Sequence, residues 1–131
     1  MRMVYSKALL DHFESPRGVG RLDASLPQVG TGNAGAYETG GVLRLQIQVD
    51  QAGTIAAACF KAYGPPALIA AGSWLTQHVQ GRRLDEAGAL THQPVAQALE
   101  FAPAQLHWAM LAEDALRGAI RNYKEKQGIH V

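Results

Sequence analysis

The sequence predicts an α+β fold, in which an antiparallel sheet carries helices packed on one face. Apolar residues alternate with polar ones between Val42 and Val49, which is typical of a half-buried strand. Asp50–Gly53 then supplies a hairpin turn that returns the chain antiparallel. The second half of the chain has helical periodicity instead. Strands therefore come early in the chain, and helices come late.

The N-terminal segment predicts a short amphipathic helix. Tyr5, Leu9 and Phe13 recur every four residues, so their side chains share one helix face. Ser6 is a suitable N-cap for this helix, and Pro16 ends the run.

The segment from Gly18 to Gly41 is rich in Gly, Pro, Asn, Thr and Ser, so we expect mostly loop or short extended pieces. After the first strand and its turn, Thr54–Tyr63 predicts the returning strand, although its run of alanines has weak strand preference. Gly64–Pro66 breaks that strand. The expected helices that follow, the first of them closed by Gly81, cover residues 67–80, 84–90, 94–99 and 103–126.

The charge and cysteine counts exclude several classes of protein. Twelve basic and eleven acidic residues give a net charge of +1, which argues against a nucleic-acid partner held by a basic field. Apolar stretches fall short of the ~18–20 residues of a membrane span, and the start shows no secretion signal. One cysteine allows neither an internal disulfide nor a Cys-rich metal site. We therefore expect one cytoplasmic domain over residues 1–131, with no nucleic acid or membrane as partner.

A glycine motif and an acidic pair invite functional interpretations that their context does not favour. Gly30–Gly35 matches GxGxxG, but neither a preceding strand nor a following helix is expected, so we interpret it as a Gly-rich loop. Glu113 and Asp114 are adjacent on the last helix and point about 100° apart, so they cannot converge on one substrate. Pairing of each with Arg117 predicts a solvated helix face instead.

Two histidines and the single cysteine are the other reactive side chains. His12 and His107 lie beside apolar positions of predicted helices, where a hydrogen-bonded structural histidine is more common than a ligand. Cys59 lies on the second predicted strand, where nothing nearby predicts a lowered thiol pKa. The sequence spacing indicates no Ser-His-acid arrangement.

Short blocks along nearly the whole chain resemble a known family. In order and spacing they are similar to IscU and to the N-terminal domain of NifU, the scaffolds of iron–sulfur cluster assembly. The resemblance implies a three-stranded antiparallel sheet flanked by helices. The blocks are Tyr5–Ser6, Asp11–Phe13, Pro16–Gly20, Val29–Gly32, Leu45–Val49, Phe60–Gly64, Leu84–Ala87, His107 and Leu111–Ala115.

The family's site is where this sequence departs from the pattern. The resemblance implies a [2Fe–2S] cluster or zinc, held by three cysteines, one aspartate and a nearby histidine. Soft thiolates are needed there because neutral side chains cannot hold bridged iron. We therefore expect no cofactor, and His107 is the one weak metal candidate. The five positions that the resemblance assigns to the former cluster site are Thr39, Gly41, Pro65, His107 and Trp108.

The replacements predict an aromatic plug in place of the metal. A Trp108 ring buried in the vacated corner would contribute about 2–3 kcal/mol. Pro65 would also stabilise the fold, because a proline lowers the conformational entropy of the unfolded chain. We expect a chain that is ordered without metal. The family's chaperone-docking motif is altered as well, since Phe101–Gln105 keeps one proline and has no lysine.

These observations favour a non-enzymatic protein that acts through contacts with a cysteine desulfurase or another assembly component. The resemblance puts the partner-binding residues at Tyr5, Phe13, Pro16 and Arg17. A scaffold that shares ligands with a partner, using His107, is one alternative, and an enzyme with His107 as general base lacks a nucleophile.

A further alternative, from another class, is a small-molecule binding module in the former metal corner. Its pocket would be lined by Tyr37, Thr39, His107 and Trp108.

Overall fold

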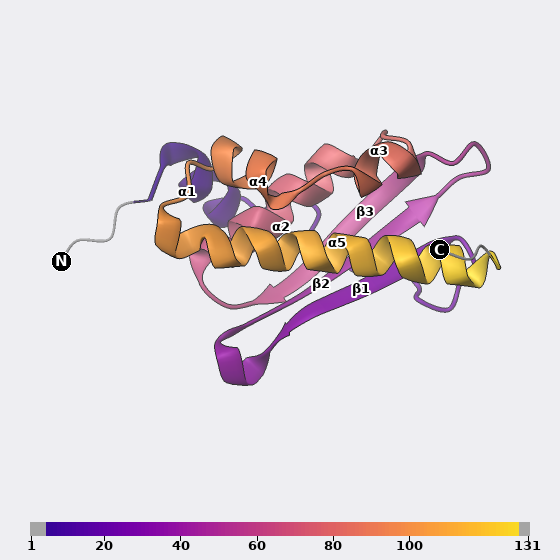
Figure 1. Cartoon of the computed structure of the whole chain (residues 1–131), viewed down its shortest axis with the longest axis horizontal. Coiled ribbons are helices and arrows are strands. Elements are labelled where there is room, and N and C mark those ends of the chain that lie inside the picture. Colours follow the sequence, from indigo (N-terminus) through magenta and orange to yellow (C-terminus); the bar gives the residue numbers. More distant parts are fainter. Residues whose placement is uncertain (1–4, 129–131) are drawn as a thin grey trace.

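A computed structural model describes residues 5–128, and its centre is a three-stranded antiparallel sheet (Figure 1). The strands are β1 (Val29–Ala36), β2 (Gly41–Val49) and β3 (Ile55–Tyr63), in the order β1-β2-β3. Helices pack against this sheet, so the predicted α+β class is confirmed, as are the strand over 42–49 and its antiparallel return.

The predicted helices are also confirmed, with ends that differ by a few residues. Ser6 caps the first one, because its Oγ accepts the Leu9 amide at 3.0 Å. Gly81 follows the second at a φ of +85°, as a helix-terminating glycine does. The last helix starts at Leu106, after a 3₁₀ turn at Pro103–Gln105. The helices are α1 (Lys7–Glu14), α2 (Pro66–Val79), α3 (Leu84–Gly88), α4 (His92–Ala98) and α5 (Leu106–Lys126).

The apolar face of β2 forms the centre of the core. Leu43, Leu45 and Ile47 are fully buried, as the alternation predicts. Gln46 points to the other face and is buried too, because residues before β1 cover it. Its side chain accepts the Leu22 amide at 2.8 Å and donates to the Leu22 carbonyl at 3.1 Å and Thr31 Oγ1 at 3.0 Å.

The expectation of mostly loop between Gly18 and Gly41 is wrong for its second half, which is the eight-residue strand β1. Gly30 and Gly32 face α5 at very short range. A β-carbon on Gly30 would lie 2.1 Å from the Ala119 carbonyl oxygen, and one on Gly32 would lie 2.0 Å from that of Ala115. The GxGxxG match is therefore a strand whose glycines admit a helix, and neither a loop nor a phosphate cradle.

Helix α5 runs lengthwise along the sheet, and the other helices gather beside it (Figure 1). Its C-terminal end is tied to the segment before β1. Lys126 Nζ donates to the carbonyl oxygens of Ala24, Leu26 and Val29 at 2.6, 3.0 and 2.8 Å. Within residues 5–128, no helix combines the length and the apolar character needed to cross a bilayer.

Candidate functional site

Three chain turns meet at one end of the sheet, on the left in Figure 1. The first is the 3₁₀ turn Tyr37–Thr39 between β1 and β2, and the second is Gly64–Pro65 between β3 and α2. The third is the first turn of α5. Gly64 lies so close to the first turn that a β-carbon on it would be 3.2 Å from Gly41 Cα. We call this region the corner.

Trp108 closes the corner by lying over Gly41. A β-carbon on Gly41 would be 2.4 Å from Trp108 Cζ3 and 3.0 Å from Leu68 Cδ2. The indole is half-buried and packs against the core. His107 beside it is exposed, and its ring meets the indole edge-to-face, with 4.7 Å between centroids. The contact leaves no room for any side chain at position 41.

The other two expected site residues serve the local backbone. Thr39 is exposed, and its Oγ1 donates to the Ala36 carbonyl at 2.9 Å, which closes the 3₁₀ turn. Pro65 is extended and precedes α2, and its carbonyl accepts the Leu68 amide at 3.0 Å. The structure thus brings Gly41, Trp108 and the Pro65 turn together, whereas the Thr39 hydroxyl is bonded within its own turn.

The donor set of the corner does not fit an iron–sulfur cluster. In the described part of the chain no three His, Cys, Asp or Glu side chains converge as metal ligands. Cys59 is paired with Gln46 in the sheet, and its Sγ donates to Gln46 Oε1 at 3.7 Å on the outer sheet face. Burial raises the pKa of this thiol, which outweighs the opposite effect of Arg44. The interpretation of Cys59 as a packed, unactivated side chain is confirmed.

The expected partner-binding residues are partly used by the fold itself. Tyr5, the residue before the N-cap of α1, and Phe13 of α1 both pack against the core. Arg17 forms an ion pair with Asp11, with 2.8 Å between Nη2 and Oδ2. Pro16 is exposed. The role of these four residues in binding a partner stays a prediction, since Tyr5, Phe13 and Arg17 already have contacts within the fold.

His12 is a structural histidine, as predicted. It is buried, and its Nδ1 lies 2.7 Å from Ser73 Oγ on α2. The same Oγ accepts the Arg17 amide at 2.8 Å, and the Ser73 hydroxyl can donate to Nδ1 when the ring is neutral with its proton on Nε2. Burial and the Arg17 charge lower the pKa of His12, and Asp11 opposes them. This hydrogen-bond pair holds α1 against α2.

Glu113 joins α4 to α5 rather than acting as a proton donor. Its carboxylate accepts the His92 amide at 2.6 Å and Arg117 Nε at 3.0 Å. Burial favours a higher pKa for Glu113, but the bonds from Arg117 and His92 outweigh it, so the pKa is lowered. The predicted pairing with Arg117 is therefore confirmed for Glu113 and wrong for Asp114. Asp114 is exposed and has no ion pair among residues 5–128.

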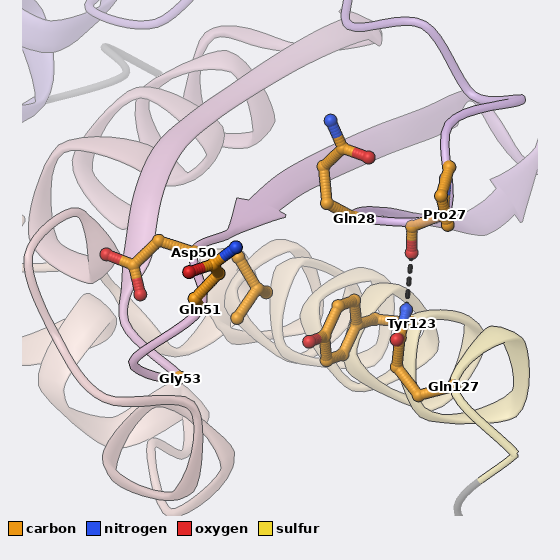
Figure 2. Close-up of a pocket in the computed structure, with 8 residues that line it drawn as sticks. Pro27, Gln28, Asp50, Gln51, Gly53, Tyr123 and Gln127 are labelled. Atoms are coloured by element: carbon orange, nitrogen blue, oxygen red, sulfur yellow. Dashed lines mark hydrogen bonds between the residues drawn. The ribbon is translucent and has the colours of Figure 1, made fainter.

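A separate hollow of about 400 Å³ lies at the opposite end of the sheet (Figure 2). Tyr123 of α5 and Gln127, the residue after α5, face the β2–β3 hairpin across it, and Gln127 Nε2 donates to the Pro27 carbonyl at 2.6 Å. Asp50 is the one titratable group besides Tyr123 in its lining. A lining with one carboxylate and no histidine or cysteine offers no constellation for catalysis or metal binding.

Comparison with known proteins decides the family. The description "NifU-like N terminal domain" fits residues 4–130 of the chain. The chain belongs to this family. It is 48% identical to the "Iron-sulfur cluster assembly scaffold protein IscU" of Haemophilus influenzae, over 96% of this chain and 100% of the relative. It is 46% identical to the protein of the same description from Azotobacter vinelandii, over 97% and 99%.

A solved structure supports the fold of this family member. The N-terminal part of a NifU-like protein from Brucella abortus superimposes with a TM-score of 0.71 at 16% identity, over 92% of this chain and 94% of that one. The resemblance found in the sequence is thus confirmed. The chain is a homologue of iron–sulfur cluster assembly scaffolds, which are scaffolds and not enzymes, and it has one cysteine.

Proposed function

We propose that this family member does not scaffold an iron–sulfur cluster and acts through contacts with a cysteine desulfurase. The observation that carries the proposal is the contact of Trp108 with Gly41. Two positions that the family resemblance assigns to a cysteine and the aspartate hold a large ring and no side chain. A cluster needs thiolates at such positions, and an indole ring fills the space instead.

The surface around the corner supports a protein partner. Large exposed apolar side chains lie on the elements that meet there: Leu10 of α1, Leu106 and Met110 of α5, Tyr37 of the 3₁₀ turn and Tyr63 of β3. Exposed apolar side chains at one end of a protein are typical of interaction surfaces. Tyr5, Phe13, Pro16 and Arg17 belong to the same end of the molecule through α1, and we include them in the proposed contact.

Binding to the host's cysteine desulfurase tests the proposed contact. We expect a complex on size-exclusion chromatography and a dissociation constant measurable by calorimetry. Met110→Glu should weaken it by about tenfold or more, since it adds a charge to a side chain that is 50% exposed. Leu26→Glu is a matched control, because Leu26 is 37% exposed and lies at the other end of α5, where its carbonyl accepts Lys126 Nζ at 3.0 Å. Absence of a complex with the wild-type chain would refute the contact.

Anaerobic reconstitution with iron and sulfide tests the loss of scaffolding separately. The wild-type chain alone should stay colourless and hold no stoichiometric iron. Colour that develops only with the desulfurase would support the alternative in which a partner's thiolates and His107 share a cluster. A coloured single chain would overturn the proposal, whatever the binding experiment shows.

The small-molecule alternative in the corner gains no support from the hollow nearest to it. Tyr37 lines that hollow together with Tyr63, Arg44 and Lys61, and its lining includes none of Thr39, His107 and Trp108. The aromatic wall expected in the corner is therefore divided: the indole is packed on Gly41, and Tyr37 faces the outer side of the sheet.

A further inference from the structure

The outer face of the sheet carries two positive charges side by side. Arg44 on β2 is paired in register with Lys61 on β3 and with Asn33 on β1. Directly paired residues of antiparallel strands point their side chains to the same face, and like charges there repel each other. Within residues 5–128 neither Arg44 nor Lys61 forms an ion pair. The pair lacks a counter-charge.

Arg44 also has an unused donor. Its Nε atom is buried and has no hydrogen-bond partner in the described part of the chain. Buried polar atoms are nearly always hydrogen-bonded, and leaving a charged group unsatisfied is expensive. Gln46, the next residue of β2 on this face, bonds to Thr31 and to Leu22 instead. The Arg44 guanidinium therefore has no acceptor within the described part of the chain, and a ligand in the hollow would reach it through the two Nη atoms rather than through the buried Nε.

These groups line a hollow. Asn33, Tyr37, Arg44, Lys61 and Tyr63 surround a space of about 230 Å³. The rings of Tyr37 and Tyr63 meet at a tilt of 56°, with 5.3 Å between centroids, and form an exposed aromatic wall. The hollow thus combines two cations, one side-chain amide and an aromatic wall, which is the composition of a small-ligand site with a few polar anchors.

A second hollow of about 770 Å³ shares Asn33 and Arg44 with the first and extends toward Arg21. It contains one carboxylate, that of Asp23. This carboxylate is already engaged, since it accepts the Ser25 amide at 2.9 Å and Ser25 Oγ at 2.6 Å. Within residues 5–128 Asp23 forms no ion pair with Arg44.

We propose that this outer-face site binds the phosphate group of a small molecule whose ring lies against Tyr37 and Tyr63. A guanidinium binds phosphate oxygens through two parallel N–H bonds, and a neighbouring ammonium adds a point charge. Arg44 and Lys61 supply these groups, and the Asn33 amide adds a donor. The polar anchors Arg44, Lys61 and Asn33 take no part in the proposed desulfurase contact, and the two proposals share only the rings of Tyr37 and Tyr63.

Titration with inorganic pyrophosphate and with adenosine monophosphate, at fixed ionic strength, tests the site. Backbone amide NMR should show saturable shifts on β1, β2 and β3 around positions 33, 44 and 61. The nucleotide should in addition shift the Tyr37 and Tyr63 ring signals. The double variant Arg44→Gln, Lys61→Gln should lose about tenfold or more in affinity. Arg121→Gln with Lys124→Gln removes the same charge from α5, where these residues line another hollow, and should bind as the wild type does.

Thermal unfolding supplies a second readout, which does not rely on the NMR shifts. Removing the repulsion should leave the ligand-free Arg44→Gln variant as stable as the wild type or more stable, whereas pyrophosphate should raise the melting temperature of the wild type only. Shifts that never saturate, or an equal loss of affinity in the α5 control variant, would overturn the proposal. So would binding of a polyglutamate peptide but of neither phosphate compound.

Discussion

The indole of Trp108 and the missing side chain of Gly41 are complementary. A β-carbon at position 41 would stand 2.4 Å from the ring, so a side chain fits at position 41 only when residue 108 is smaller than tryptophan. In the family resemblance these positions belong to a cysteine and an aspartate, which are smaller than tryptophan and larger than glycine. The corner has therefore been rebuilt as a packed contact, and each half of that contact depends on the other.

A double-mutant cycle measures this dependence. Gly41→Ala alone should destabilise the protein by about 1–3 kcal/mol, since the new methyl group overlaps the ring. Trp108→Ala alone should cost about 2–3 kcal/mol for a half-buried ring. The double variant should recover about 1 kcal/mol or more of the sum, because alanine at position 108 removes the clash. If the losses in free energy of unfolding, measured in urea, were strictly additive, the packing of Trp108 on Gly41 would be contradicted.

Restoring the four lost ligands should restore metal binding. The variant Thr39→Cys, Gly41→Asp, Pro65→Cys, Trp108→Cys is expected to bind zinc stoichiometrically, since three thiolates and a carboxylate would join His107. The same variant without Trp108→Cys is the control, because the indole still fills the space. Zinc content after gel filtration measures both. Equal zinc in the wild type and the restored variant would contradict the assignment of these positions.

The glycine contact between β1 and α5 should be the least tolerant of an added methyl group. Gly32→Ala places a β-carbon 2.0 Å from the Ala115 carbonyl oxygen and 2.3 Å from the Ala119 nitrogen. Backbone atoms of a packed helix cannot turn aside, so we expect a loss of about 3 kcal/mol or more. Gly88→Ala is the control, since its β-carbon meets nothing closer than 4.0 Å. Chemical denaturation should show little change there.

The attachment of α1 should weaken in mild acid. The folded pKa of His12 lies below its ordinary value of 6.5, through burial and the charge of Arg17. The stabilisation is therefore complete above pH 6.5 and is lost as the pH falls below it, because the folded state resists protonation. His12→Asn should flatten this part of the stability profile, with an amide in place of Nδ1. His78, whose pKa is also lowered, is present in both proteins and cancels in the comparison.

The thiol of Cys59 should react slowly. Its pKa is raised from 9.0 by burial, so the thiolate fraction at pH 7.5 is smaller than that of a free cysteine. Alkylation by iodoacetamide should be about tenfold or more slower in the folded protein than in urea. Fast labelling of the native chain would show a reactive thiol and would contradict the raised pKa.

The elements with strong periodicity were predictable, and those set by contact were not. The alternating apolar residues Leu43, Leu45 and Ile47 predict β2, because every second side chain of a strand lies on the same face. Gly30 and Gly32 weaken any local preference for a strand, and their reason is the α5 backbone far along the chain. Tertiary contact, invisible in the local sequence, overrides propensity there.

The site was predictable in what it lacks and not in how it is filled. The resemblance identified the replaced ligand positions, and the composition limited the chain to one cysteine. Gly41 and Trp108 replace two ligands by a small residue and a large one, which suggests a contact between them. Only the fold shows that the two residues touch. The outer-face pair of Arg44 and Lys61 needed the strand register, which no local pattern supplies.

The closeness of α5 to β1 also fixes the helix along its own axis. Gly30 and Gly32 receive the helix backbone at Ala119 and Ala115, so sliding by one turn, about 5.4 Å, would drive other parts of the helix into the strand. Lys126 anchors the far end to three carbonyls. A protein that binds the first turn of α5 therefore meets a helix that cannot slide along its axis. It has to bind Trp108 in the position that the fold gives it.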